Sequence, residues 1–194
     1  MGYLLGVLAI AVGIPLSIAL HEIGHLYGLG HSALGETELL AGGGRRVIAA
    51  ESVMFPIAFS AGNIAARTLK ADDIAGISEL YPSGSYLVDT GTIAGRVTKN
   101  GQGVYGAHVV AFNQATGALV GGLTLDKEGR FAISGLSPGP HVLRVEPLDD
   151  VSLDSFFDDT SAVDIDFRVT FLRRYAVAPA GGASNSVVVP VTPK

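Results

Sequence analysis

Five residues near the start of the chain have the types and spacing of a metal-dependent hydrolytic site. His21, Glu22, His25, Gly28 and His31 form the pattern H-E-x-x-H-x-x-G-x-x-H. Two histidines four residues apart project from one face of a helix, one turn apart, so they can share one ion. The glutamate beside the first histidine can reach a metal-bound water without binding the metal itself. The spacing therefore predicts a metal site with a carboxylate next to it.

The third histidine of this pattern requires the chain to turn. His31 lies ten residues after His21, about 15 Å along a continuous helix, so it reaches the same ion only if the helix ends. Gly28 can adopt the left-handed conformation that ends a helix and reverses the chain. Three neutral imidazoles leave the fourth tetrahedral position of Zn²⁺ open to water, which is typical of a catalytic site. We therefore predict one catalytic zinc ion held by the three histidines.

The element that must carry the first two histidines is a helix. Pro15 suits the first turn of a helix, where its missing N–H leaves no hydrogen bond unmade, and the sequence predicts a buried helix over residues 16–29. Residues 2–20 contain no charged side chain, so a membrane-spanning or signal segment is the alternative interpretation. The buried helix is favoured because the uncharged run continues directly into the metal-binding pattern.

The eleven-residue pattern resembles the signature of the metzincin metallopeptidases. Met54 lies within residues 51–56, E-S-V-M-F-P, which are similar to the methionine turn of the matrixin branch. Ser32, directly after the third histidine, is also similar to matrixins. Residues 69–81 resemble the closing helix of the matrixin catalytic domain, with the pattern Asp-Asp-Ile-x-Gly-Ile-x-x-Leu-Tyr. The three similarities occur in the order that the family has them.

This resemblance implies a secreted zinc endopeptidase that cleaves protein or peptide substrates. His21, His25 and His31 would hold Zn²⁺, and Glu22 would act as the general base toward the bound water. Gly28 and Met54 would support the site without binding the metal. The implied fold is a partial zincin-type subdomain made of the active-site helix, the methionine turn and the C-terminal helix.

The resemblance covers residues 15–82 and leaves out the upstream part of a matrixin. Matrixins have a twisted sheet before the active-site helix that holds the substrate by strand addition, and they carry further zinc and calcium sites there. Fourteen residues before Pro15 leave no room for these parts, so the sequence predicts an N-terminally truncated domain. The alternative is a catalytically impaired remnant whose second domain acts as an adhesion or binding module.

After residue 84 the pattern changes to short apolar strands separated by turn residues. Asn100-Gly101 predicts a tight turn, and residues 126–129 predict another. The predicted strands lie at residues 92–97, 107–112, 119–124, 130–133 and 141–145, with further strands after residue 169. Their glycine and aspartate positions resemble the carboxypeptidase regulatory-like (transthyretin-like) domains. We therefore predict an α+β chain with a peptidase domain over residues 1–84 and an all-β immunoglobulin- or transthyretin-like sandwich over residues 85–194.

Other polar residues of the sequence are assigned structural roles. Asp72 and Asp73 stand where a helix begins and favour a capping role over a metal role. His108 and His141 lie in predicted strands and are interpreted as structural or surface residues. The aspartates between residues 149 and 166 lack the spacing of a calcium loop, so calcium is possible there but not supported by a motif.

Two other segments have no assigned chemistry. Residues 33–50 are predicted to be a loop. Residues 57–68 are expected to form the apolar wall of a substrate pocket, as the matrixin resemblance implies.

Composition excludes several classes of function. The 194 residues include 13 Lys and Arg against 18 Asp and Glu, for a net charge of −5, so nucleic acid is not an expected partner. Cysteine is absent, which removes disulfides and thiolate ligands together. Any metal site must therefore use histidine and carboxylate side chains.

Overall fold

The computed structural model describes residues 16–42, 45–57, 67–148 and 153–194. The helices are α2 (Leu16–Leu26), α3 (Ala71–Leu80) and α4 (Tyr86–Asp89), with a short 3₁₀ turn at Leu153–Ser155. The strands are β1 (Gly35–Leu39), β2 (Arg45–Ala50), β3 (Gly91–Lys99), β4 (Gln102–Gly103), β5 (His108–Phe112), β6 (Leu119–Leu123), β7 (Arg130–Leu136), β8 (Gly139–Glu146), β9 (Thr170–Phe171), β10 (Ala176–Ala178) and β11 (Ala183–Val191). The described chain is therefore mostly β, with few helices.

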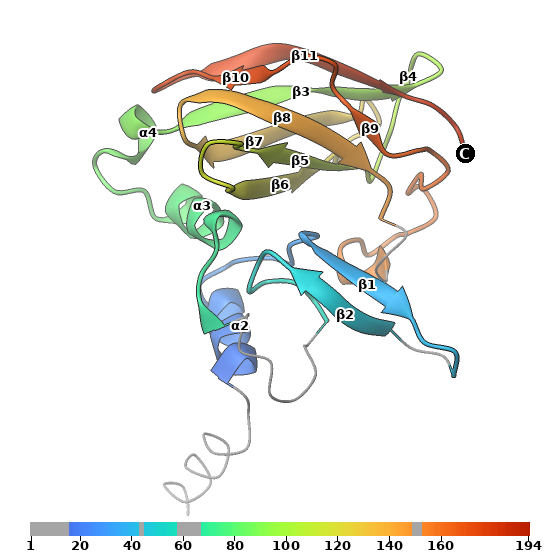
Figure 1. Ribbon diagram of the computed structural model, residues 1–194, viewed down its shortest axis with the longest axis horizontal. Coiled ribbons are helices and arrows are strands. Elements are labelled where there is room, and N and C mark those ends of the chain that lie inside the picture. The colour runs from blue at the N-terminus through green and yellow to red at the C-terminus, as the bar shows by residue number, and fades with distance from the viewer. Residues whose placement is uncertain (1–15, 43–44, 58–66, 149–152) are drawn as a thin grey trace, which may run out of the picture.

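The strands after α4 form two sheets that pack face to face (Figure 1). One sheet has the order β10-β8-β5-β6, and β9 also pairs with β8. The other has the order β11-β3-β4, and β7 also pairs with β3. Strand β11 runs parallel to β3, whereas the other pairs are antiparallel. This arrangement is the β-sandwich that the alternating pattern predicts.

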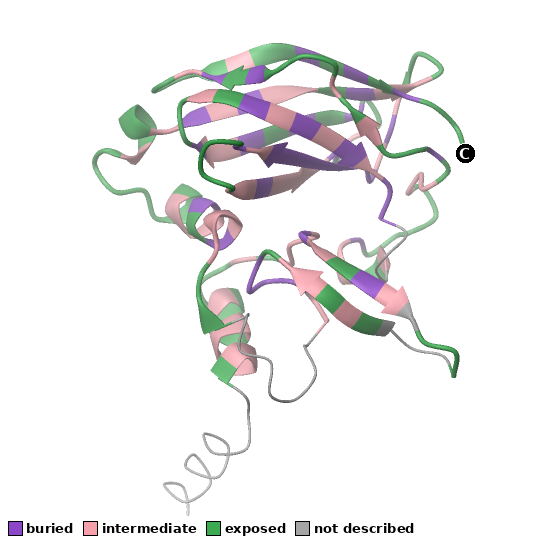
Figure 2. Ribbon diagram, viewed as in Figure 1, coloured by how far each residue is buried: buried purple, intermediate pink, exposed green. Residues whose placement is uncertain are grey.

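The main core lies between the two sheets. Successive side chains of a strand point to opposite faces, so buried residues alternate with less buried ones along much of β3 and β8, whereas His108 to Ala111 of β5 are all buried (Figure 2). Ile93, Val97, Leu143 and Val145 have no exposed surface. Helix α3 also reaches this core, because Ala75 is buried in it and a side chain at Gly135 would collide with Ala75.

Tight turns join these strands where the sequence predicts them. Asn100 and Gly101 both have positive φ, 53° and 83°, as a two-residue hairpin turn requires. Gly129 has φ of 70°, and a Cβ there would lie 2.3 Å from the Val97 carbonyl oxygen. Only glycine combines that conformation with so close an approach of two backbones.

A second core covers part of the outer face of the β10-β8-β5-β6 sheet. Phe55, Leu148 and Phe157 are buried in it. Half-buried side chains around them come from both halves of the chain: Ala33, Val47, Ala50, Ile57, Tyr105, Leu123, Leu153, Phe156 and Val163. The β1–β2 hairpin and the segment before it are therefore packed onto the sandwich. The proposed boundary between residues 84 and 85 stays a prediction.

Two predictions for the N-terminal part are wrong. Helix α2 ends at Leu26 rather than at residue 29, and none of its residues is buried; Leu26 is 82% exposed. An apolar helix is buried only where other elements cover it on most sides, and the described residues do not cover α2 in that way. Residues 33–50, predicted to be a loop, contain the β1–β2 hairpin with a bulge after Glu36. Its charged, short strands gave little alternation to detect.

Other predictions lie largely outside the described residues. Residues 2–15 of the uncharged run, and residues 58–66 of the predicted pocket wall, are not described. In the part of the chain that the structure describes, no helix is long and apolar enough to cross a membrane. The zincin-type subdomain as a whole is not seen: its helix and methionine segment are present without a covering sheet among the described residues.

Candidate metal centre

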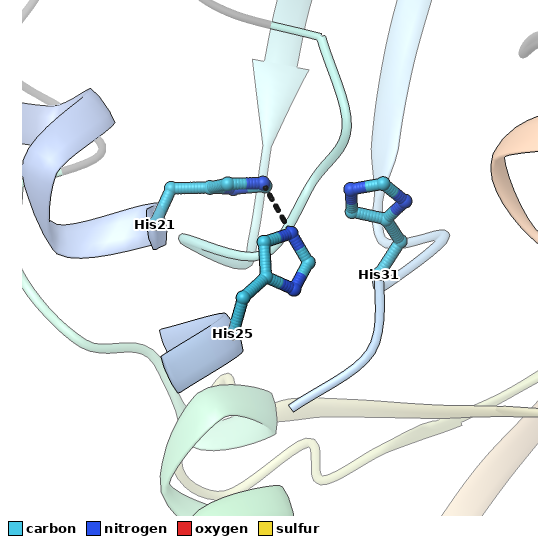
Figure 3. A group of neighbouring side chains, drawn as sticks. All are labelled: His21, His25 and His31. Atoms are coloured by element: carbon cyan, nitrogen blue, oxygen red, sulfur yellow. Dashed lines mark hydrogen bonds between the residues drawn. The ribbon is translucent and has the colours of Figure 1, made fainter. Parts of the chain in front are cut away.

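Three histidine side chains meet beside the end of α2 (Figure 3). His21 and His25 come from the helix, and His31 comes from the segment after it. One ring nitrogen from each lies within 4.8 Å of the other two, and the ring centroids are 4.7–5.4 Å apart. We call this group the histidine cluster. Among the described residues it is the only set of three or more potential metal ligands brought together.

The histidine cluster is held from behind by backbone carbonyl groups. The Nδ1 atoms of His21, His25 and His31 lie 2.8 Å from the carbonyl oxygens of Val53, Leu29 and Ser155, respectively. A carbonyl oxygen only accepts hydrogen bonds, so each Nδ1 carries the proton. The neutral form of each ring then has its lone pair on Nε2, as in histidines that bind metals.

The Nε2 atoms face one another. Those of His21 and His25 are 3.1 Å apart, and a nitrogen of the His31 ring points toward the same space (Figure 3). Two lone pairs at that distance repel each other unless a proton or a cation lies between or beside them. The donor set, three imidazole nitrogens without thiolate or carboxylate, suits Zn²⁺. The residues present therefore fit the metal that the sequence predicts.

The two residues predicted to support the site lie close to α2. Gly28 has φ of 91°, the left-handed conformation that turns the chain back toward the helix. Met54 is buried, and its carbonyl accepts a hydrogen bond from the Ser32 N–H. A Cβ at Gly24 would lie 2.3 Å from the Met54 sulfur, so the methionine packs directly against the helix.

Glu22 occupies an exposed position on α2. Within the described part of the chain it forms no hydrogen bond or ion pair. The structure places it one residue from His21 on the same helix, as the sequence requires, and shows no partner that would orient its carboxylate.

The two aspartates at the start of α3 connect separate segments. Asp73 is buried and accepts hydrogen bonds from the N–H groups of Lys70 and Val53 and from the Ser52 hydroxyl. It therefore caps the helix, as predicted, and also fixes the segment that contains Met54. Asp72 accepts from Ser32 Oγ at 2.5 Å and from the Gly121 N–H at 2.8 Å. Burial raises the pKa of Asp72 above its usual value.

A pocket of about 210 Å³ lies between the segment that carries His31 and strands β5 and β6 of the sandwich. The residues that line it are 29–33, Met54, Asp72, Asp73, His108, 121–123 and 125. His108 is 2% exposed, and its Nε2 has no hydrogen-bond partner. Its Nδ1 lies 3.0 Å from Glu146 Oε1.

The sequence did not reveal the pairing of His108 with Glu146. The two residues are 38 positions apart and meet only because β5 and β8 pair in a register that sets them opposite each other. His141 is also buried, and its Nδ1 lies 3.1 Å from the Gly139 carbonyl oxygen. Burial lowers the pKa of His141 below its usual value of 6.5.

A known family model matches part of the sandwich. Residues 92–156 match the family model of the carboxypeptidase regulatory-like domain, the segment where the sequence resembles those domains. The match covers less than half of the chain. A comparison with curated proteins finds no match.

Solved structures with some similarity cover about half of this chain. They are the TIE protein of Bacillus anthracis (13% identity, TM-score 0.32, 54% of this chain and 17% of that one), BcpA, the major pilin subunit of Bacillus cereus (13%, 0.36, 54% and 30%), and a DUF3823 family protein from Parabacteroides merdae (15%, 0.31, 55% and 47%). The chain thus spans less than half the length of each of them. Similarity at this level supports no inference of function from these proteins to this chain.

The family comparison overturns the peptidase interpretation. The family model that matches is that of the carboxypeptidase regulatory-like domain, over residues 92–156, and not that of a metallopeptidase. The prediction of a matrixin-type zinc endopeptidase with Glu22 as general base is therefore wrong. An eleven-residue pattern specifies a local turn of helix and three ligands. It does not specify the substrate-binding sheet on which a peptidase depends.

Proposed function

We propose that this chain is an extracellular binding module for a protein or peptide partner, built on the β-sandwich. The observation that carries the proposal is the family match of residues 92–156, which coincides with six strands and most of the main core. Cell fractionation of the producing organism tests the extracellular location.

The surface proposed for the partner is the uncovered part of the β10-β8-β5-β6 sheet. One end of its outer face, around His108 and Leu123, lies under the N-terminal segment. The other end carries apolar side chains, of which Pro140, Phe171 and Val177 are exposed. We call it the open sheet face; it consists of Phe112, Pro140, Val142, Phe171 and Val177.

Strand register places these residues on one face. Phe171 pairs with Arg144 and Val177 pairs with Pro140, and these two positions of β8 are four residues apart and so point the same way. The neighbours of Val177 on β10 are buried in the main core, so Val177 itself points outward. Phe171 and Val177 are 58% and 54% exposed. Contiguous exposed apolar residues, aromatic ones above all, are typical of protein-binding surfaces.

We further propose that the histidine cluster holds one Zn²⁺ ion. His21, His25 and His31 would supply three ligands through Nε2. When bound, the metal supplies a fixed link between α2 and the segment after it. Three protein ligands leave one coordination position for water or a neighbouring group.

A matched pair of variants tests the binding surface. Val177 and Val188 are both exposed strand valines, 54% and 51%, but Val188 lies on β11 of the opposite sheet. Peptides selected against the wild-type chain from a phage-displayed library are the probe. We expect Val177→Asp to weaken their binding at least about tenfold, because a charge in an apolar interface costs more than 1.4 kcal/mol, and Val188→Asp to leave it unchanged.

The outcome of that experiment is decisive in either direction. Equal binding to wild type and to Val177→Asp would contradict the open sheet face as the site. Failure to select any peptide would contradict a peptide-binding function. Thermal unfolding of both variants verifies that each remains folded.

A further inference from the structure

The third ligand of the histidine cluster is oriented by the sandwich. The Nδ1 of His31 donates to the carbonyl oxygen of Ser155, which lies 124 residues further along the chain. The other two rings donate to carbonyl groups of the N-terminal part itself. Ser155 ends the 3₁₀ turn in the connection between β8 and β9. The cluster is therefore completed only where the sandwich meets the N-terminal segment.

The segment that carries Ser155 is packed against the same N-terminal residues. The N–H groups of Phe156 and Phe157 both donate to the Leu153 carbonyl at 3.0 Å, which closes the turn. The Phe156 ring stands edge-on to the His31 ring, with centroids 6.3 Å apart. Phe157 is buried in the second core together with Phe55. A movement of this turn would therefore remove both the hydrogen bond and the ring contact of His31.

We propose that Ser155 is a positioning residue of the metal site, and that Zn²⁺ binding and the docking of residues 153–157 onto the N-terminal segment stabilise each other. The inference rests on the zinc site proposed above. An imidazole bound to a metal through Nε2 donates more strongly from Nδ1, and its acceptor fixes the orientation of the ring. Coupling of this kind is reciprocal. If the docked turn strengthens zinc binding by some factor, bound zinc strengthens the docking of the turn by the same factor.

The proposal makes the histidine cluster a link within the molecule. Two side chains of the described N-terminal part reach across to the sandwich. His31 donates to the Ser155 carbonyl oxygen, and Asp72 accepts a hydrogen bond from the Gly121 N–H. A metal that fixes His31 would tighten one of these two contacts. The second core, shared by both parts, would then be held together by zinc as well as by apolar packing.

Hydrogen exchange on the wild-type chain is the first test, with Zn²⁺ alone as the probe. Saturating zinc is expected to slow exchange of the Phe156 and Phe157 amides at least about tenfold. The Val97 and Val104 amides, which are bonded within the main core at 2.8 and 3.1 Å, serve as controls and are expected to change less. Equal changes at both places would reveal general stabilisation and overturn the specific coupling.

Zinc affinity of two phenylalanine variants is the second test. Phe156→Ala removes the ring beside His31, whereas Phe171→Ala makes the same truncation on the open sheet face. We expect Phe156→Ala to weaken zinc binding about 10- to 100-fold, the usual loss when an outer-shell partner of a metal ligand is disturbed, and Phe171→Ala to have no effect. In the NMR spectrum, the His31 Nδ1 proton signal of the zinc-loaded chain should broaden or vanish only in Phe156→Ala.

The two tests separate this inference from the zinc site itself. Unchanged zinc affinity and an unchanged His31 signal in Phe156→Ala would overturn the role of the turn while the site stands. No zinc binding by the wild-type chain would overturn both.

Discussion

At the scale of single residues, hydrogen bonds to backbone carbonyl groups orient the three rings of the histidine cluster. Each ring already donates from Nδ1 to a carbonyl oxygen, so each presents an unprotonated Nε2 to the common space. This pre-orientation lowers the cost of assembling three ligands around one ion. The three histidines of the sequence pattern lie together, whereas the zinc ion stays a prediction and the enzyme class drawn from the pattern was wrong.

Zinc binding should depend on the histidines and not on the neighbouring glutamate. Loss of a ligand costs more affinity than loss of an outer-shell partner, so we expect His25→Ala to weaken zinc binding by more than about 100-fold. Glu22→Gln should bind zinc like the wild type, because Glu22 is exposed and is not a ligand. Isothermal titration with Zn²⁺ measures both. Loss of binding in Glu22→Gln would show that the carboxylate is a ligand after all.

A buried histidine of the sandwich should make stability depend on pH. Burial lowers the pKa of His141 in the folded chain. Below about pH 6.5, His141 therefore binds a proton in the unfolded chain but stays neutral in the folded chain. The stability that this residue contributes is therefore present above that pH and is lost as the pH falls toward the folded pKa. Denaturant unfolding of wild type and His141→Gln at pH 7 and pH 5.5 tests this.

The quantity to compare is the difference in unfolding free energy between wild type and His141→Gln. The free energy of unfolding of wild type, relative to His141→Gln, should fall between pH 7 and pH 5.5. A constant difference would contradict the lowered pKa.

At the scale of elements, turns with left-handed residues determine how the sandwich strands meet. Gly129 stands directly before β7, and a Cβ there would collide with the Val97 carbonyl oxygen of β3. Gly117 has a similar φ, 76° against 70°, but nothing lies within 4 Å of its Cβ position. The two glycines therefore share one conformation and differ in their surroundings.

This pair allows backbone strain to be separated from steric contact. Gly117→Ala should cost about 1–2 kcal/mol of unfolding free energy, the usual penalty of a left-handed alanine. Gly129→Ala should cost about 3–5 kcal/mol, because two backbone segments must also move apart. Denaturant unfolding measures both values. Equal costs would contradict the close packing of β7 on β3.

Sequence patterns predicted elements better than their packing. The alternation after residue 84 predicted the sandwich strands, and Asn100-Gly101 predicted a hairpin turn, because both signals are local. The β1–β2 hairpin was missed, since its strands are short and charged. The contacts of His108 with Glu146 and of His31 with Ser155 join residues 38 and 124 positions apart. No local pattern can reveal them.

At the scale of the whole molecule, the N-terminal part is an addition to the outer face of a sandwich. It covers one end of the β10-β8-β5-β6 sheet through the second core and leaves the open sheet face free. The histidine cluster lies where the two parts meet. A metal at this position would hold the covering segment in place, and a partner would bind the surface that remains.

Mass spectrometry of a bound peptide tests the central claim most directly. A peptide selected on the open sheet face is incubated with the zinc-loaded chain, and its mass is measured before and after. The proposed function predicts that the peptide is bound and recovered intact. Cleavage that disappears in Glu22→Ala would contradict the binding-module function and restore a zinc peptidase.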